Sequence, residues 1–126
     1  MRDFKKLEIW QRSHRSTLSV YTLTNYFPPE ERYGLSSQMR RSASSVPTNI
    51  AEGCGRNSIP DLKRYLIIAC GSLSELHYQI ILSNDLRYFH ASIFKELAEE
   101  VIQIRKMIHA YSEKLDPPVR ALKADS

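Results

Sequence analysis

The chain has 126 residues, of which 42% are hydrophobic and only 4 are glycine, and its formal net charge is +4. This is the length of one domain with a real core, and the scarcity of glycine favours helix over sheet. The polar residues 1–6 precede no apolar leader, and no uncharged apolar run reaches the ~20 residues that span a bilayer, which argues against secretion or membrane insertion.

Two cysteines, Cys54 and Cys70, have no paired histidines near them and so do not make a zinc site. We expect both to be small buried residues with reduced thiols, which fits a cytoplasmic protein.

Charge is unevenly distributed along the chain. Residues 1–64 contain 11 Lys and Arg against 6 Asp and Glu, whereas residues 65–126 contain 7 against 8. A basic first half favours a phosphate-bearing or otherwise acidic partner. The alternative is that the net charge of +4 only aids solubility.

A first helix is predicted from Phe4 to Tyr26, where apolar residues recur at spacings of 3 and 4. One face consists of Leu7, Trp10, His14, Leu18 and Tyr21. We expect His14 to be a core histidine rather than a ligand. A second apolar strip consists of Ile9, Val20, Leu23 and Phe27. Two apolar sides exceed the needs of one bundle core, so we expect this second strip to contact another subunit.

A second helix is predicted to begin at Pro29 and to end at Gly53 and Gly55. Its core stripe is Leu35, Met39, Ala43, Val46 and Ile50. Pro47 removes the amide that would bond to the carbonyl of Ala43, so we expect a kink and a Ser or Thr hydroxyl near that carbonyl.

A polar stripe runs beside this core stripe at spacings of 4, 3, 4 and 3. Its members are Gln38, Ser42, Ser45, Asn49 and Glu52. Small hydroxyl residues are mediocre formers of exposed helix, which favours packing against a neighbouring helix over solvation. The neighbour could belong to the same chain or to another subunit, and we assign Ser42, Ser45 and Asn49 to an oligomer interface.

Two further helices complete the pattern. The third begins after a Ser58 cap, carries Gly71 at an expected close crossing with the second helix, and ends at Asn84-Asp85. The fourth runs from Ala91 to Asp116. We therefore predict an all-α, up-down-up-down four-helix bundle over residues 1–116, with a disordered tail at 117–126.

Signatures of enzymes and cofactor sites are missing from the sequence. No histidine follows a Glu or Asp by three residues, no histidine pair has i, i+4 spacing, and no phosphate loop or G-x-S-x-G motif occurs. We expect no catalytic residues, metal or cofactor. A metal- or cofactor-dependent bundle enzyme is the alternative that these missing pairs disfavour.

Basic residues outside the core stripes are the best candidates for function. Arginine forks match phosphate geometry, and a nucleic-acid surface would gather them. The predicted nucleic-acid contacts are Arg40, Arg41, Arg56, Lys63 and Arg64, with a second set of Lys5, Lys6, Arg12 and Arg15.

Several ordered motifs resemble a known bacterial family. They are Leu7–Gln11, Phe27-Pro28, Glu31–Leu35, Gln38–Ala43, Asn49–Gly53 and Gly71–Leu76. This set resembles the four-helix bundle proteins encoded in intervening sequences of 23S ribosomal RNA genes. The resemblance implies a bundle that assembles as a ring, typically a pentamer. The chain also looks distantly like accessory variability proteins of diversity-generating retroelements, which are basic pentameric bundles that bind RNA and a reverse transcriptase.

Together these observations predict a non-enzymatic homo-oligomer that binds structured RNA through a basic face and does not bind membranes. The alternative is a protein-interaction scaffold without nucleic-acid contact, which the two apolar sides of the first helix and the serine-rich stripe would also suit.

Overall fold

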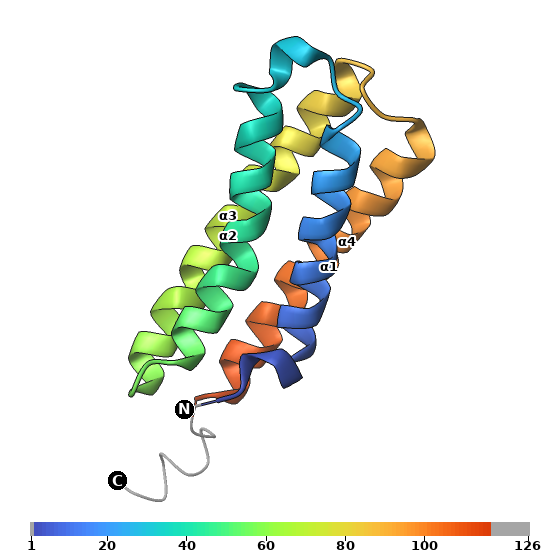
Figure 1. The fold of residues 1–126 in the computed structure, drawn as a ribbon. Helices are drawn as coiled ribbons and strands as arrows, with labels where there is room; N and C mark the ends of the chain where they lie inside the picture. The colour runs from blue at the N-terminus through green and yellow to red at the C-terminus, as the bar shows by residue number, and fades with distance from the viewer. Residues whose placement is uncertain (1, 117–126) are drawn as a thin grey trace, which may run out of the picture.

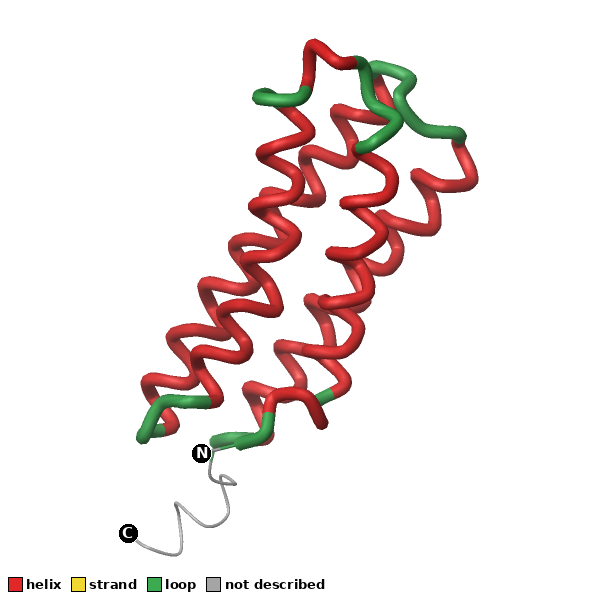
Figure 2. Tube along the Cα trace, in the orientation of Figure 1, coloured by secondary structure: helices red, strands yellow, loops and turns green. Residues whose placement is uncertain are grey.

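The computed structural model describes residues 2–116 and folds them into four consecutive antiparallel helices (Figure 1). The helices are α1 (Glu8–Thr24), α2 (Leu35–Cys54), α3 (Ile59–Asp85) and α4 (Ala91–Lys114). Two short 3-10 helices, η1 (Phe4–Lys6) and η2 (Pro29–Glu31), precede α1 and α2. No strand occurs within the described residues (Figure 2). The predicted all-α four-helix bundle is confirmed, and the tail predicted at 117–126 lies outside the described residues.

The helix boundaries follow local chemistry, with one correction. Ser58 caps α3 as predicted, because its hydroxyl accepts a hydrogen bond from the backbone N–H of Asp61 at 3.2 Å. Pro29, however, opens only the short η2 helix. Gly34 has a non-helical backbone, with φ −110° and ψ −112°, so α2 begins at Leu35 instead of Pro29.

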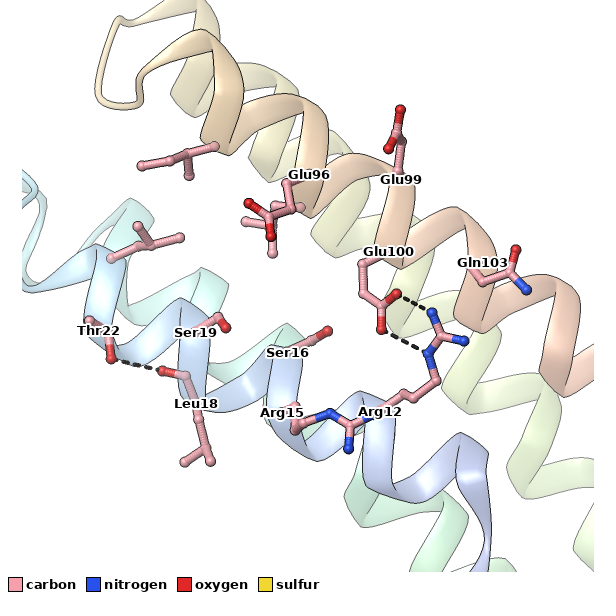
Figure 3. Close-up of a pocket in the computed structure, with 13 residues that line it drawn as sticks. Arg12, Arg15, Ser16, Leu18, Ser19, Thr22, Glu96, Glu99, Glu100 and Gln103 are labelled. Carbon is pink, nitrogen blue, oxygen red and sulfur yellow. Dashed lines mark hydrogen bonds and ion pairs between the residues drawn. The ribbon is translucent and has the colours of Figure 1, made fainter.

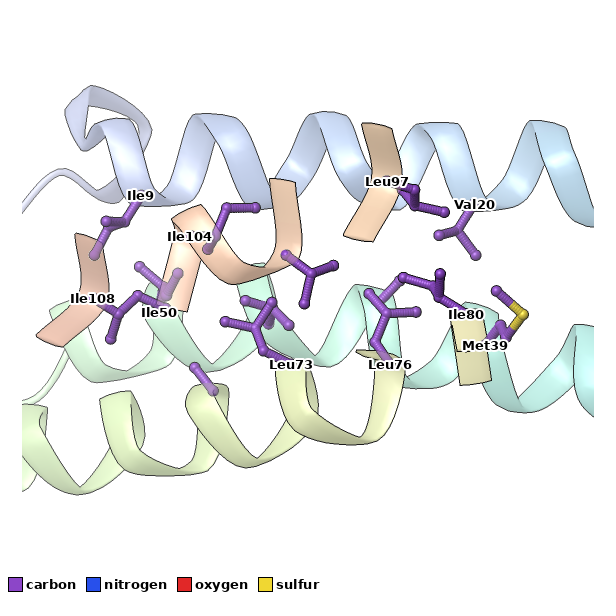
Figure 4. Close-up of a cluster of buried hydrophobic side chains, with 14 of the residues drawn as sticks. Ile9, Val20, Met39, Ile50, Leu73, Leu76, Ile80, Leu97, Ile104 and Ile108 are labelled. Atoms are coloured by element: carbon purple, nitrogen blue, oxygen red, sulfur yellow. The ribbon is translucent and has the colours of Figure 1, made fainter. Parts of the chain in front are cut away.

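The buried face of α1 differs from the one that the sequence predicts. Ile9, Val20 and Phe27 are buried in the interior of this one chain, where a second subunit cannot reach them, and Leu23 packs against that interior. Figure 4 shows Ile9 and Val20 within this core. The assignment of these four residues to an oligomer interface is therefore wrong for the three buried ones. Serines and threonines complete the buried face, namely Ser13, Ser16, Thr17 and Thr24.

These hydroxyls can be buried because three of them donate to carbonyls of their own helix. Ser13 bonds to the carbonyl of Trp10, Thr17 to that of Ser13 and Thr24 to that of Val20, at 2.7–3.0 Å. The larger apolar side chains of the other face point outward, with Leu18 54% exposed and Tyr21 44% exposed.

The polar stripe of α2 packs against α3 of the same chain. The hydroxyl of Ser42 donates to the amide oxygen of Gln79 at 2.6 Å, and both side chains are buried. Ser45 and Ser72 share a hydrogen bond at 2.8 Å, and the amide of Asn49 donates back to the carbonyl of Ser45. Of the two alternatives left by the sequence, the intrachain one holds for Ser42 and Ser45, so their assignment to an oligomer interface is corrected. Asn49 bonds only within α2, and its assignment stays a prediction.

The hydroxyl predicted near the carbonyl of Ala43 is present in the structure. The helix continues without interruption through Pro47, and the hydroxyl of Thr17 on α1 donates to the carbonyl of Ala43 at 3.1 Å. The carbonyl that proline leaves without an amide is thus satisfied from the adjacent helix.

The close helix crossing lies at Gly53, not at Gly71. A Cβ on Gly53 would stand 2.9 Å from the Cβ of Tyr65 and 3.0 Å from Cδ1 of Leu62, so only glycine fits between α2 and α3. A Cβ on Gly71 would meet nothing within 4 Å, because Gly71 faces away from the bundle.

We predict that Gly53→Ala lowers the free energy of unfolding by about 1–3 kcal/mol, because the methyl group overpacks the α2–α3 crossing. Urea denaturation measures the change. Gly55→Ala is the matched control, since its Cβ would sit 3.5 Å from the nearest atom, a normal contact. We expect the control to change by less than about 0.5 kcal/mol. Equal stability of the two variants would contradict the proposed crowding.

Candidate nucleic-acid interface

Basic residues from three parts of the sequence lie at the same end of the bundle. The backbone N–H of Arg2 donates to the carbonyl of Cys54 at 3.1 Å, which ties the N-terminal segment to the end of α2. The α2–α3 turn and the end of α4 lie at this same end (Figure 1). We call this surface the basic end, and it consists of Arg2, Lys5, Lys6, Arg56, Lys63, Arg64 and Lys114.

Five of the nine predicted contacts therefore lie at this end of the bundle, namely Lys5, Lys6, Arg56, Lys63 and Arg64. Arg2 and Lys114 join them but were missed by the sequence prediction. Nothing in the local sequence around either residue indicates that it lies beside the α2–α3 turn.

Three members of the basic end are partly neutralised by carboxylates. Arg56 and Arg64 both bond to Asp61, at 2.9 and 3.1 Å, and Lys63 pairs with Asp116. Hydrogen bonds from Arg56 and then Arg64 lower the pKa of Asp61 below its ordinary value. Both guanidinium groups also lie over the ring of Tyr65, at 5.3 and 4.8 Å from its centroid.

Lys5 and Lys6 keep their charges available. Both side chains are exposed, and neither forms an ion pair with the described residues. Their backbone is nevertheless well held, because Asp3 accepts from the N–H of Lys5 and Gln11 donates to the carbonyl of Lys5. Two free amines on an anchored turn can bind phosphate oxygens.

Arg12 and Arg15 lie elsewhere, beside a groove of about 830 Å³ between α1 and α4 (Figure 3). Arg12 grips the carboxylate of Glu100 with two nitrogens, one of them Nε at 3.0 Å, and this bond raises the pKa of Arg12. Arg12 therefore links α1 to α4 through an ion pair and is not a free phosphate ligand. Arg15 is exposed and has no ion-pair partner in the described residues.

Arg40 and Arg41 have different roles although they are adjacent. Arg40 donates to the hydroxyl of Thr24 at 2.8 Å, to the side-chain oxygen of Asn25 at 2.8 Å and to the carbonyl of Tyr21 at 3.2 Å. It also lies over the ring of Tyr21 at 4.7 Å. Its Nε and Nη2 donors thus fasten α2 to the end of α1, which makes Arg40 a structural residue in place of the free phosphate ligand that the sequence predicts. Arg41 is exposed on α2, about three and a half turns of helix before the end that adjoins the basic end.

The comparisons with known proteins bear on the whole bundle. The family model of the 23S rRNA-intervening sequence protein matches residues 5–110. The chain belongs to this family. Its structure is similar to the crystal structure of a protein of unknown function from the S23 ribosomal protein family of Bacteroides thetaiotaomicron. The TM-score is 0.77 at 20% identity, over 82% of this chain and 97% of the other, which supports the fold. No curated protein matches the chain.

The cysteines and His14 show no sign of a reactive or metal-binding role in this structure. Burial raises the pKa of both thiols, at Cys54 and Cys70, so both stay protonated at neutral pH. His14 is exposed and stacks on Trp10 at 5.0 Å, which corrects its prediction as a core residue. Between residues 2 and 116, no three His, Cys, Asp or Glu side chains are grouped to hold a metal ion.

We predict that Arg40→Ala lowers the free energy of unfolding by about 1–2 kcal/mol, because it removes three hydrogen bonds between α2 and the end of α1. Arg41→Ala, one position along, should change it by less than about 0.5 kcal/mol. Chemical denaturation of the two variants provides the comparison, and a larger effect at Arg41 would contradict these roles.

A second prediction concerns pH. Because the folded pKa of Asp61 is lowered, its contribution to stability is present above its unfolded pKa and is lost as pH falls through the folded value. Wild type should therefore be more stable than Asp61→Asn at neutral pH, and the difference should shrink below about pH 4. Urea denaturation from pH 7 to pH 3 tests this, with Glu99→Gln, an exposed carboxylate without an ion pair in the described residues, as control. A difference that is independent of pH would contradict the assignment.

Proposed function

We propose that the protein is a non-enzymatic, self-associating four-helix bundle that binds structured RNA through the basic end. The observation that carries this proposal is the position of Lys5 and Lys6 at the same end of the bundle as the α2–α3 turn, with neither amine paired to an acidic partner among the described residues. Membership of a family named for 23S rRNA supports an RNA-related role. A cytoplasmic location belongs to the same proposal, because both cysteines are free thiols.

The chemistry of the basic end favours the phosphate backbone over bases. Lysine amines act as point charges toward phosphate, and they bind without reading sequence. Tyr65, the aromatic ring beside Arg56 and Arg64, is half-buried and covered by those guanidinium groups, so it is poorly placed to stack on an unpaired base. Recognition by shape and phosphate contacts is typical of folded RNA.

A protein-interaction scaffold is the second candidate. Its support is the outer surface of α3, which exposes more large apolar side chains than the other helices of the described chain. A partner captured from cell extract that survives nuclease treatment would favour this function over RNA binding.

We predict that the double variant Lys5→Glu, Lys6→Glu binds a ribosomal RNA fragment roughly tenfold or more weakly than wild type at low salt. Each lost phosphate contact should also reduce the slope of log affinity against log salt by about 1. Filter binding across a salt series measures both quantities.

The matched control is Lys95→Glu, Lys106→Glu, which makes the same change in net charge on exposed positions of α4. We expect it to keep its affinity within about twofold of wild type, because the two lysines lie away from the basic end. Equal losses in the two double variants would show a dependence on net charge alone. Absence of binding by wild type at low salt, or binding that salt does not affect, would refute the proposed function.

A further inference from the structure

A row of rings on α1 remains at the surface of the bundle. Trp10, His14 and Tyr21 are spaced by 4 and 7 residues, so they lie on one side of the helix. Tyr21 on this side contacts Arg40 of α2, so the row follows the seam between these two adjacent helices (Figure 1). His14 is exposed and Tyr21 is 44% exposed. Burial in the core therefore does not explain why rings occupy these two positions.

The row of rings continues onto the N-terminal turn. The rings of Phe4 and Trp10 lie 5.1 Å apart, and those of Trp10 and His14 lie 5.0 Å apart with their planes 11° from parallel. Phe4 belongs to η1, which also carries Lys5 and Lys6 of the basic end. The row therefore begins beside two unpaired amines. We define the aromatic strip as Phe4, Trp10, His14 and Tyr21.

The helices on both sides of the strip lack acidic residues over most of their length. α1 has no Asp or Glu after Glu8, and α2 has none before Glu52, although these two stretches contain four arginines. One of the four, Arg41, is exposed and forms no ion pair within residues 2–116. It follows Arg40, which lies over Tyr21, so its charge is at the Tyr21 end of the strip. A surface with cations and no anions attracts a polyanion.

Rings interleaved with cations are typical of surfaces that bind single-stranded nucleic acid. Every base has a flat face that can stack on an exposed ring, and every phosphate can pair with an amine or a guanidinium. Bases inside a duplex are already stacked and paired, so only unpaired nucleotides can use the rings. From Trp10 to Tyr21 the strip extends about 17 Å, the length of about five stacked nucleotides. A protein partner could cover the rings equally well, but the missing acidic residues favour a polyanion.

The strip is also better placed for stacking than the ring of the basic end. Two guanidinium groups lie over Tyr65, whereas Tyr21 has the one guanidinium of Arg40 over it and stays 44% exposed. His14 is exposed and turns one face toward Trp10, because the two ring planes are nearly parallel. Its second face is directed away from Trp10, which makes His14 the first position at which a base can stack.

From these observations we infer that the aromatic strip binds unpaired nucleotides of an RNA whose phosphates also contact Lys5 and Lys6. His14 and Tyr21 stack on bases, and Arg41 pairs with a phosphate at the far end of the strip. This inference rests on the RNA binding in the proposed function and adds the part of the RNA that is recognised, namely unpaired bases next to a folded element. It also gives a role to an exposed arginine that lies outside the basic end.

Two RNAs separate the strip from the basic end. One is a single strand of about 12 nucleotides without self-complementarity, and the other is the duplex of the same sequence. His14→Ala should weaken binding of the single strand roughly tenfold and change the duplex affinity by less than about twofold, because only unpaired bases stack on the ring. His14→Phe keeps a ring and should bind the single strand within about threefold of wild type. Filter binding at low salt measures these affinities.

Controls are available on α4. His109→Ala removes an exposed imidazole from another helix and should leave both affinities within about twofold of wild type. Arg41→Ala should reduce the slope of log affinity against log salt for the single strand by about 1, whereas Lys106→Ala, which removes an exposed charge from α4, should not. Trp10, the chain's one tryptophan, adds an optical readout, since its fluorescence should change more with the single strand than with the duplex.

The outcomes separate this inference from the proposed function. Wild type that binds the duplex but not the single strand would overturn this inference alone and leave the strip to a protein partner. Wild type that binds neither RNA would overturn both. Equal losses for the two RNAs in His14→Ala, or a loss in His14→Phe as large as that in His14→Ala, would overturn stacking on the strip while the contacts of Lys5 and Lys6 stand.

Discussion

The bundle depends on how α2 meets its two neighbours. Pro47 leaves the carbonyl of Ala43 without its helical amide, and a buried carbonyl must find a donor. Thr17 supplies that donor from α1, and one residue earlier on α2 Ser42 bonds to Gln79 of α3. Two hydrogen bonds on one turn of α2 therefore set the heights of both neighbouring helices. Gly53 completes the arrangement by allowing α3 to approach where any side chain would collide.

This register explains where the charges lie. With α1 and α2 aligned, Arg40 reaches the end of α1 and its donors are used there, while Arg2 reaches the end of α2. The N-terminal segment is then held against the end of α2, which places its lysines at the same end of the bundle as the arginines of the α2–α3 turn. The basic end is thus a product of helix alignment as much as of composition.

The basic residues of this chain include arginines, such as Arg12 and Arg40, that hold the fold together and lysines, such as Lys5 and Lys6, that stay unpaired among the described residues. A planar guanidinium can bond several oxygens at once, and Arg12 and Arg40 each use it to join their own helix to a neighbouring one. Lys5 and Lys6 each carry a single amine on a flexible side chain, and neither amine bonds to another helix within the described residues. The residues that contribute most to the fold are therefore poor candidates for phosphate contacts, and the lysines are the better ones.

The sequence by itself determined the helical class, the turn positions, the Ser58 cap, the core stripe of α2 and the need for a hydroxyl near the carbonyl of Ala43. Periodicity and capping are local, so they can be read without the fold. The sequence pattern gave the wrong buried face for α1, because Ser13, Ser16 and Thr17 are polar residue types. Ser13 and Thr17 can nevertheless be buried, since their hydroxyls bond to carbonyls of their own helix. Only the tertiary structure decided this face, the roles of Arg12 and Arg40, and the gathering of the basic end. Each depends on contacts between residues far apart in the chain, such as Arg12 with Glu100 and Arg2 with Cys54, and no local pattern encodes such distances.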